Sequence, residues 1–103
     1  AYVPGTSTEI TESRGFLPLT QSPESRNIFD IYTQAGADIG LTIGGEFTGG
    51  SADSGFTAQV GAPTVCGTGP VGGRAHTPEE FMRLDTMVPR AKTVALAIMR
   101  LGA

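Results

Sequence analysis

The residue best suited to chemistry in this sequence is its single histidine, His76. It ends a glycine-rich stretch that reads Gly67-Thr68-Gly69-Pro70-Val71-Gly72-Gly73-Arg74-Ala75-His76. Imidazole is the commonest metal ligand among side chains, although a solitary His more often has a surface or structural role. One imidazole cannot complete a catalytic site, so any reaction needs groups from elsewhere.

A second glycine-rich turn, Gly49-Gly50-Ser51-Ala52-Asp53, follows a predicted strand, as the first stretch does. In a parallel α/β sheet, ligands bind beyond the carboxyl ends of the strands, so the two turns are expected to converge on one crevice. The glycines of the first stretch allow a close backbone approach and expose amides that suit a carboxylate: Gly67, Gly69, Gly72 and Gly73. Asp53 has stabilisation of a helix end as its alternative role, and Arg14 has no local partner.

The elements that must position these residues begin with a helix. Ser22 is the expected N-cap, Pro23 fits the first helical position, and Gly36 is the expected stop. The residues at helical spacing predict one buried face, made of Ile28, Ile31, Tyr32 and Ala35.

Short strands and a second helix are predicted around this first helix. Alternation indicates an exposed strand at 8–12 and a half-buried strand at 39–43, and a short apolar run predicts a buried strand at 63–66 that includes Cys66. A helix from Ser51 to Gly61 lies between the last two strands. The order of strands and helices predicts an α/β fold with a largely parallel sheet and flanking helices.

The last third of the chain predicts further helical structure. Thr77-Pro78-Glu79-Glu80 matches a capping box. Asp85 or Thr86 is expected to cap the final helix, with Pro89 in its first turn and Arg90 on its exposed face. Its apolar stripe is predicted from Ala91, Val94, Ala95, Ile98 and Met99.

Composition excludes several classes of function. The chain has 103 residues and a formal net charge of −3, which disfavours a nucleic-acid surface. No apolar run approaches the roughly 20 residues of a membrane span, and one Cys permits no internal disulfide. The first residues lack both an initiator Met and the features of a signal peptide, so we expect the chain to begin downstream of its true start. The compartment stays open.

Four blocks of the sequence resemble the C-terminal part of the M20 metallopeptidases, the group of glutamate carboxypeptidase, acetylornithine deacetylase and aminoacylase relatives. The blocks are Gly49 to Phe56, Gly61-Ala62-Pro63-Thr64, Gly69 to Glu80, and Val88-Pro89-Arg90 with the apolar helix that follows. Their order and spacing make the resemblance specific over roughly residues 14–103.

The resemblance implies a zinc-aminopeptidase-like catalytic domain with an inserted lid that usually dimerises. Residues 1–13 would be the end of the last lid strand, and 14–103 the C-terminal part of the catalytic domain. His76 would be a ligand of one of two divalent metal ions, usually zinc. Asp53 would support the site, Gly72 and Gly73 would line the substrate pocket, and Arg14 would lie near the substrate carboxylate.

The family's other metal ligands and its general base lie upstream of the matched blocks and are not in this sequence. The resemblance therefore implies the inactive C-terminal segment of a two-metal carboxypeptidase or deacylase that cleaves an amide next to a free carboxylate. Its partners would be the missing N-terminal catalytic portion, a small peptide or N-acyl amino acid, and a second subunit bound through the lid. Two alternatives stay open: a non-catalytic carboxylate-binding or assembly module, and a small α/β relic that binds nothing.

Overall fold

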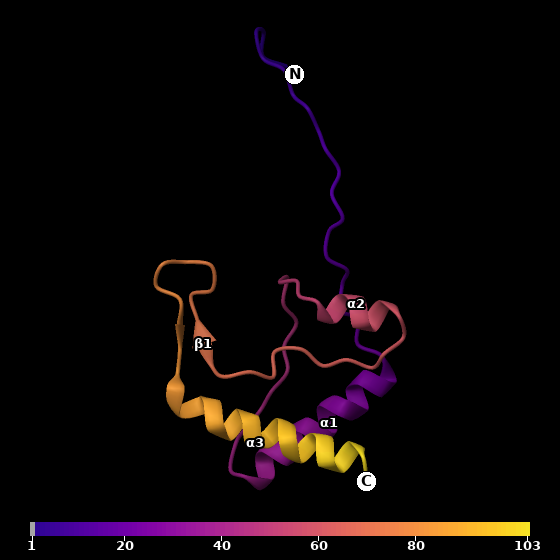
Figure 1. The fold of residues 1–103 in the computed structure, drawn as a ribbon, viewed down its shortest axis with the longest axis vertical. Helices are drawn as coiled ribbons and strands as arrows, with labels where there is room; N and C mark the ends of the chain where they lie inside the picture. Colours follow the sequence, from indigo (N-terminus) through magenta and orange to yellow (C-terminus); the bar gives the residue numbers. More distant parts are fainter. Residues whose placement is uncertain (1) are drawn as a thin grey trace.

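A computed structural model describes residues 2–103 of the chain. Two long helices cross at the base of the molecule, while an extended N-terminal segment runs away from them (Figure 1). The elements, in chain order, are α1 (Pro23–Asp38), α2 (Ser54–Gln59), β1 (Gly72–Gly73), β2 (Phe81–Met82) and α3 (Leu84–Leu101). No helix among these residues is long and apolar enough to cross a membrane.

Helix α1 begins where the sequence predicts and ends slightly later. The Ser22 hydroxyl accepts a hydrogen bond from the Ser25 amide at 3.1 Å, and Pro23 occupies the first helical position. The predicted stop at Gly36 is wrong because the helix continues to Asp38, and Gly40, at φ +84°, makes the left-handed turn that ends it.

The core of the described residues lies where α1 and α3 pack together. Its buried hydrophobic residues are Tyr32, Ala35 and Ala97, and the fully buried Thr93 lies beside them. Gly36 belongs to this contact, since a Cβ there would lie 2.5 Å from the Ile43 side chain and 3.5 Å from Thr93. Small residues therefore let the two helices approach closely. The predicted inner face of α1 is confirmed.

The face of helix α3 that packs inward is opposite to the face predicted from its apolar residues. Thr93 and Ala97 are buried against α1, whereas four of the five residues of the predicted apolar stripe are exposed: Ala91, Ala95, Ile98 and Met99. Pro89 lies inside the helix and not in its first turn. Most of the apolar surface of α3 therefore has no partner among residues 2–103.

The predicted parallel sheet does not form within residues 2–103. Their one sheet is the antiparallel pair β1–β2, and the segments 8–12, 39–43 and 63–66 carry no strand. The reason is physical: a strand exists only through hydrogen bonds to a neighbouring strand, and no neighbour lies beside these segments.

Side chains, and not a sheet, hold the segment around Thr64 in place. The Ser25 hydroxyl accepts a hydrogen bond from the Thr64 amide at 2.9 Å, and the Thr64 hydroxyl lies 2.9 Å from that of Thr57 in α2. Ser25 is itself buried. The chain that leads into the glycine-rich stretch is thus attached to both α1 and α2.

Candidate functional site

The glycine-rich stretch ends in a short hairpin that depends on its two glycines. Gly72 pairs with Met82, and Gly73 pairs with Phe81. A Cβ at Gly72 would lie 2.6 Å from the Phe81 carbonyl oxygen, and one at Gly73 would lie 2.9 Å from the Phe81 ring. Glycine is required at Gly72 because the opposite backbone passes so closely, whereas at Gly73 the exposed Phe81 ring would have to move aside.

His76 lies exposed in the loop that joins β1 to β2, in a backbone conformation that non-glycine residues rarely adopt. Its φ is +66°, and that of Arg74 is +55°. Left-handed residues cost free energy and concentrate at functional sites. Gly72, Gly73 and His76 are therefore brought together by one hairpin, and His76 is presented outward from its tip.

The predicted capping box at Thr77–Glu80 is wrong. The Thr77 hydroxyl donates to the Arg74 carbonyl at 2.8 Å, and the Glu80 amide donates to the Thr77 carbonyl at 3.1 Å. These bonds close a tight turn before β2, and the helix starts only at Leu84. A Thr with a Glu three residues later suits a turn as well as a helix start.

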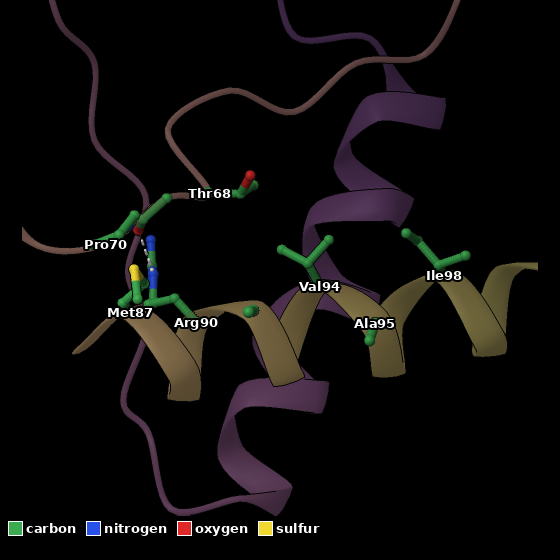
Figure 2. Close-up of a pocket in the computed structure, with 9 residues that line it drawn as sticks. Thr68, Pro70, Met87, Arg90, Val94, Ala95 and Ile98 are labelled. Atoms are coloured by element: carbon green, nitrogen blue, oxygen red, sulfur yellow. Dashed lines mark hydrogen bonds between the residues drawn. The ribbon is translucent and has the colours of Figure 1, made fainter. Parts of the chain in front are cut away.

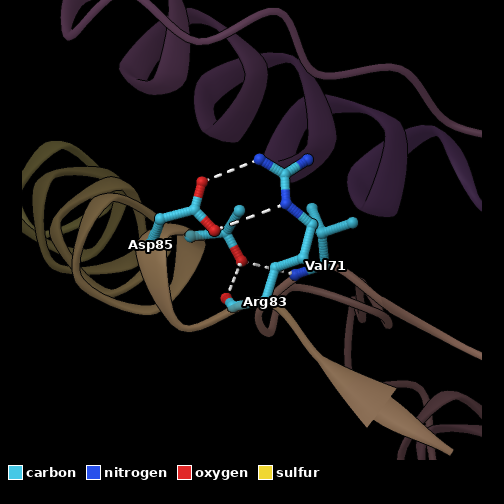
Figure 3. A network of polar contacts seen from close by, with 4 residues as sticks. Val71, Arg83 and Asp85 are labelled. Carbon is cyan, nitrogen blue, oxygen red and sulfur yellow. Dashed lines mark hydrogen bonds and ion pairs between the residues drawn. The ribbon is translucent and has the colours of Figure 1, made fainter.

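Residues at the start of α3 form hydrogen bonds with the chain just before the hairpin. The Thr86 hydroxyl accepts a hydrogen bond from the Val71 amide at 2.9 Å and donates to the Arg83 carbonyl at 2.7 Å. The Arg83 amide donates to the Val71 carbonyl at 2.8 Å. Figure 3 shows this network. The Val71 amide is thus occupied, so it is not one of the groups that could hold a substrate carboxylate.

An ion pair next to this network lies on the surface. Arg83 and Asp85 meet at 2.7 Å, and the bond lowers the pKa of the Asp85 carboxyl and raises that of the Arg83 guanidinium. Both groups are therefore charged at neutral pH. The negative charge of Asp85 in the first turn of α3 also suits the positive end of the helix dipole.

The chain before Val71 is held by one arginine and one tyrosine. Arg90 was predicted on the exposed face of the last helix, but it is half-buried: its Nε donates to the Gly69 carbonyl at 2.8 Å and its Nη2 to the Gly67 carbonyl at 3.0 Å. The Tyr32 hydroxyl donates to the Thr68 carbonyl at 3.3 Å. Burial raises the pKa of Tyr32, against the opposing effect of Arg90. Sequence periodicity missed both contacts because it does not tell which loop crosses a helix.

A shallow apolar groove of about 400 Å³ runs along α3 beside this loop. Figure 2 shows its walls, with the Arg90 guanidinium reaching the chain between Thr68 and Pro70. Residues of α3 line most of it: the exposed Met87, Ala91, Ala95 and Ile98 and the half-buried Val94.

The other predicted site residues lie apart from the hairpin. Asp53 is exposed at the start of α2, and its side chain makes no capping hydrogen bond. No contact joins α2 to β1 or β2. Arg14 is exposed in the N-terminal segment. The expected convergence of the two glycine turns is therefore absent from the described residues. Cys66 is exposed, which corrects the predicted buried thiol.

The described residues supply one good metal ligand and no complete metal site. Nowhere in residues 2–103 do three or more His, Cys, Asp or Glu side chains form a group that could hold a metal ion. The exposed imidazole of His76 has the chemistry of a single ligand. The donor set fits a metal only if further ligands come from outside these residues.

Comparison with known families decides what kind of protein this is. A family model described as peptidase family M20/M25/M40 matches residues 4–100. The chain belongs to this family. No curated protein and no solved structure gives a significant match. The M20 membership confirms the resemblance seen in the sequence blocks and places the chain among peptidases and related hydrolases, which generally use metal ions.

Proposed function

We propose that this M20 chain is the C-terminal segment of a two-metal carboxypeptidase or deacylase that cleaves a peptide or amide bond next to a free carboxylate. One observation carries the proposal. The only histidine of a chain matched by the M20 family over residues 4–100 lies exposed in a left-handed loop conformation. Such a conformation is retained where presentation of the side chain matters.

In this proposal His76 is a metal ligand. Divalent ions of this kind polarise a carbonyl and lower the pKa of a bound water. The chain's own contribution is geometric: the β1–β2 hairpin and the Thr77 turn fix the loop from which the imidazole projects. Gly72 and Gly73 line the substrate pocket, Arg14 attracts the substrate carboxylate, and Asp53 supports the site.

The remaining ligands and the general base come from an N-terminal catalytic portion. The structure supports this proposal through surfaces that have no partner among the described residues. The extended segments 39–43 and 63–66 lack neighbouring strands, and α3 exposes Val88, Ile98 and Met99. In the proposed full protein these segments join a parallel sheet, and residues 1–13 end the lid through which two subunits pair.

Replacing His76 by Asn tests the proposal most directly. Asn tolerates the left-handed conformation better than Ala does, so the substitution removes the imidazole and keeps the loop. Metal content by mass spectrometry and hydrolysis of N-acyl amino acids would be measured on the intact protein. We expect bound metal to fall by about one ion per active site and kcat to fall at least ~100-fold, because the metal supplies much of the activation.

Arg74→Asn is the matched control, since Arg74 lies in the same loop at the same kind of φ. We expect this variant to keep its metal and its activity. Full metal content and normal turnover in the His76→Asn protein would remove His76 from the metal site.

A non-catalytic carboxylate-binding or assembly module is the second candidate, since exposed glycine-rich backbone can bind a carboxylate without any metal. Calorimetric titration of the purified protein with N-acetyl amino acids distinguishes the two. Binding without turnover, and with no metal present, supports the module; turnover that is lost with a chelator supports the hydrolase.

A further inference from the structure

We propose that Arg90 is a positioning residue, which fixes the glycine-rich stretch so that Gly72, Gly73 and His76 lie correctly for substrate. The inference deepens the proposed function and rests on it. It concerns a residue that does not touch substrate but ties the backbone before the hairpin to the two-helix core.

The geometry requires an arginine. One guanidinium reaches two carbonyl oxygens that are two residues apart, that of Gly69 at 2.8 Å and that of Gly67 at 3.0 Å. A planar fork with several fixed N–H groups can do this, whereas a lysine ammonium presents a single point of charge on a flexible stem. Lysine at this position would keep the charge and lose the bridge.

Tyr32 completes the attachment from the other helix. The centre of the Arg90 guanidinium lies 5.5 Å from the centroid of the Tyr32 ring, within the range of a cation–π contact. The Tyr32 hydroxyl donates to the carbonyl of Thr68, between the two carbonyls that Arg90 binds. Three consecutive carbonyls are thus bound by side chains from α1 and α3.

This attachment continues without a gap into the hairpin. After the three bound carbonyls comes Pro70, whose φ is fixed by its ring. The next residue, Val71, is bound through both its amide and its carbonyl by Thr86 and Arg83. Gly72 and Gly73 then pair with β2. Movement at Gly67 would therefore be transmitted to the residues that line the proposed pocket.

Stability alone does not explain the Arg90 contacts. Gly67 and Gly69 are exposed, so water could satisfy their carbonyl oxygens at little cost. What water cannot supply is a fixed orientation of the stretch relative to α1 and α3. Fixed geometry matters greatly in catalysis, where a displacement of 1 Å can reduce a rate by about 100-fold.

The test compares Arg90→Lys with the unchanged intact protein by amide hydrogen exchange and steady-state kinetics. We expect exchange of the hydrogen-bonded Val71 amide and of the amides in the β1–β2 pair to rise by ~10-fold or more, while exchange in the buried turns of α1 and α3 stays unchanged. Because the pocket loosens and the metal does not leave, KM should rise by about 10-fold with a smaller change in kcat and full metal content. Tyr32→Phe, which removes one hydrogen bond and keeps the ring, should show the same pattern more weakly.

Arg26→Lys is the matched control. Arg26 also lies near an aromatic ring, 5.4 Å from the Phe29 centroid, and bonds only to Asp30 in its own helix. We expect no change in loop exchange or KM. Unchanged exchange at Val71 and in the β1–β2 pair for both Arg90→Lys and Tyr32→Phe would overturn the positioning role, as would a uniform rise in exchange over the whole fold. The exchange result stands even if no hydrolysis is found, so failure of the proposed function can be told apart from failure of this inference.

Discussion

At the scale of single residues, the glycines of the hairpin have a steric role that the sequence does not reveal. Glycine-rich loops suggest a ligand approaching the backbone, yet at Gly72 the group that approaches is the Phe81 carbonyl of the same chain. Gly69, only three residues earlier, has nothing within 4 Å of the place where a Cβ would lie. Two glycines of one stretch are therefore constrained quite differently.

Gly72→Ala and Gly69→Ala should separate these roles. We expect Gly72→Ala to lower the free energy of unfolding by about 1–3 kcal/mol, because the strands must move apart to admit the methyl group. Gly69→Ala should be neutral or should stabilise the fold by up to ~1 kcal/mol, since alanine lowers the entropy of the unfolded chain and Gly69 does not adopt a left-handed φ. Urea unfolding of the two variants measures both values, and equal losses would contradict the steric explanation.

At the scale of elements, the pairing of α1 with α3 combines a small core with one ion pair at the ends of the helices. Arg100, in the last turn of α3, binds Asp38 at the end of α1. Gln34 also donates to Asp38, at 2.9 Å. The hydrogen bond from Arg100, and to a smaller extent that from Gln34, lowers the pKa of the Asp38 carboxyl below its ordinary 3.8.

This lowered pKa predicts how the helix pair responds to acid. A carboxyl whose pKa is lower in the folded state stabilises the fold above the unfolded pKa and loses that contribution as the pH falls through the folded value. The contribution of Asp38 should thus be constant from neutral pH down to about pH 4 and decline below it. Because the pair is on the surface, the effect should be modest and reduced by salt.

Asp38→Asn provides the measurement. The difference in unfolding free energy between wild type and this variant should shrink below pH 4 and be steady above pH 5. Asp30→Asn is the control, since Asp30 pairs with Arg26 inside the same helix, α1. A difference that grows in acid would show that the sign of the linkage is wrong.

Sequence reasoning succeeded for elements whose signals are local. Ser22 and Pro23 mark the start of α1, and helical spacing identified Tyr32 and Ala35 as its buried face. It failed where a partner decides the outcome. Strand patterns at 39–43 and 63–66 describe segments able to pair, but pairing needs a neighbour. In α3 the apolar residues predicted one buried face, but the face that packs on α1 is the one that carries Thr93 and Ala97.

At the scale of the whole molecule, the described chain is more open than a compact domain of its length. Its radius of gyration is 18.6 Å, whereas a compact domain of 100 residues has about 13 Å. Among residues 2–103 only three hydrophobic side chains are buried, while large ones such as Val60, Val88 and Met99 are exposed. The sequence identified His76 and the glycines of the candidate site, whereas in the proposed function the remaining ligands come from outside residues 2–103 and could not be read from this sequence.

Expression of residues 1–103 alone should show the consequences of this exposed apolar surface directly. We expect strong binding of a hydrophobic dye and self-association that increases with concentration, since exposed apolar patches promote both. Light scattering after size exclusion measures the association. Val88→Lys combined with Met99→Lys, on the exposed surface of α3, should reduce both signals while helical content stays the same. A compact, dye-negative monomer would contradict this account.

The exposed thiol of Cys66 gives the molecule a built-in place for a spectroscopic reporter. It is the only cysteine of the chain, and the next residue is Gly67, whose carbonyl Arg90 binds. A nitroxide attached there needs no engineered residue and introduces no competing label. Its paramagnetic line shape would follow, in real time, whether the backbone ahead of the hairpin tumbles with the helices or independently of them.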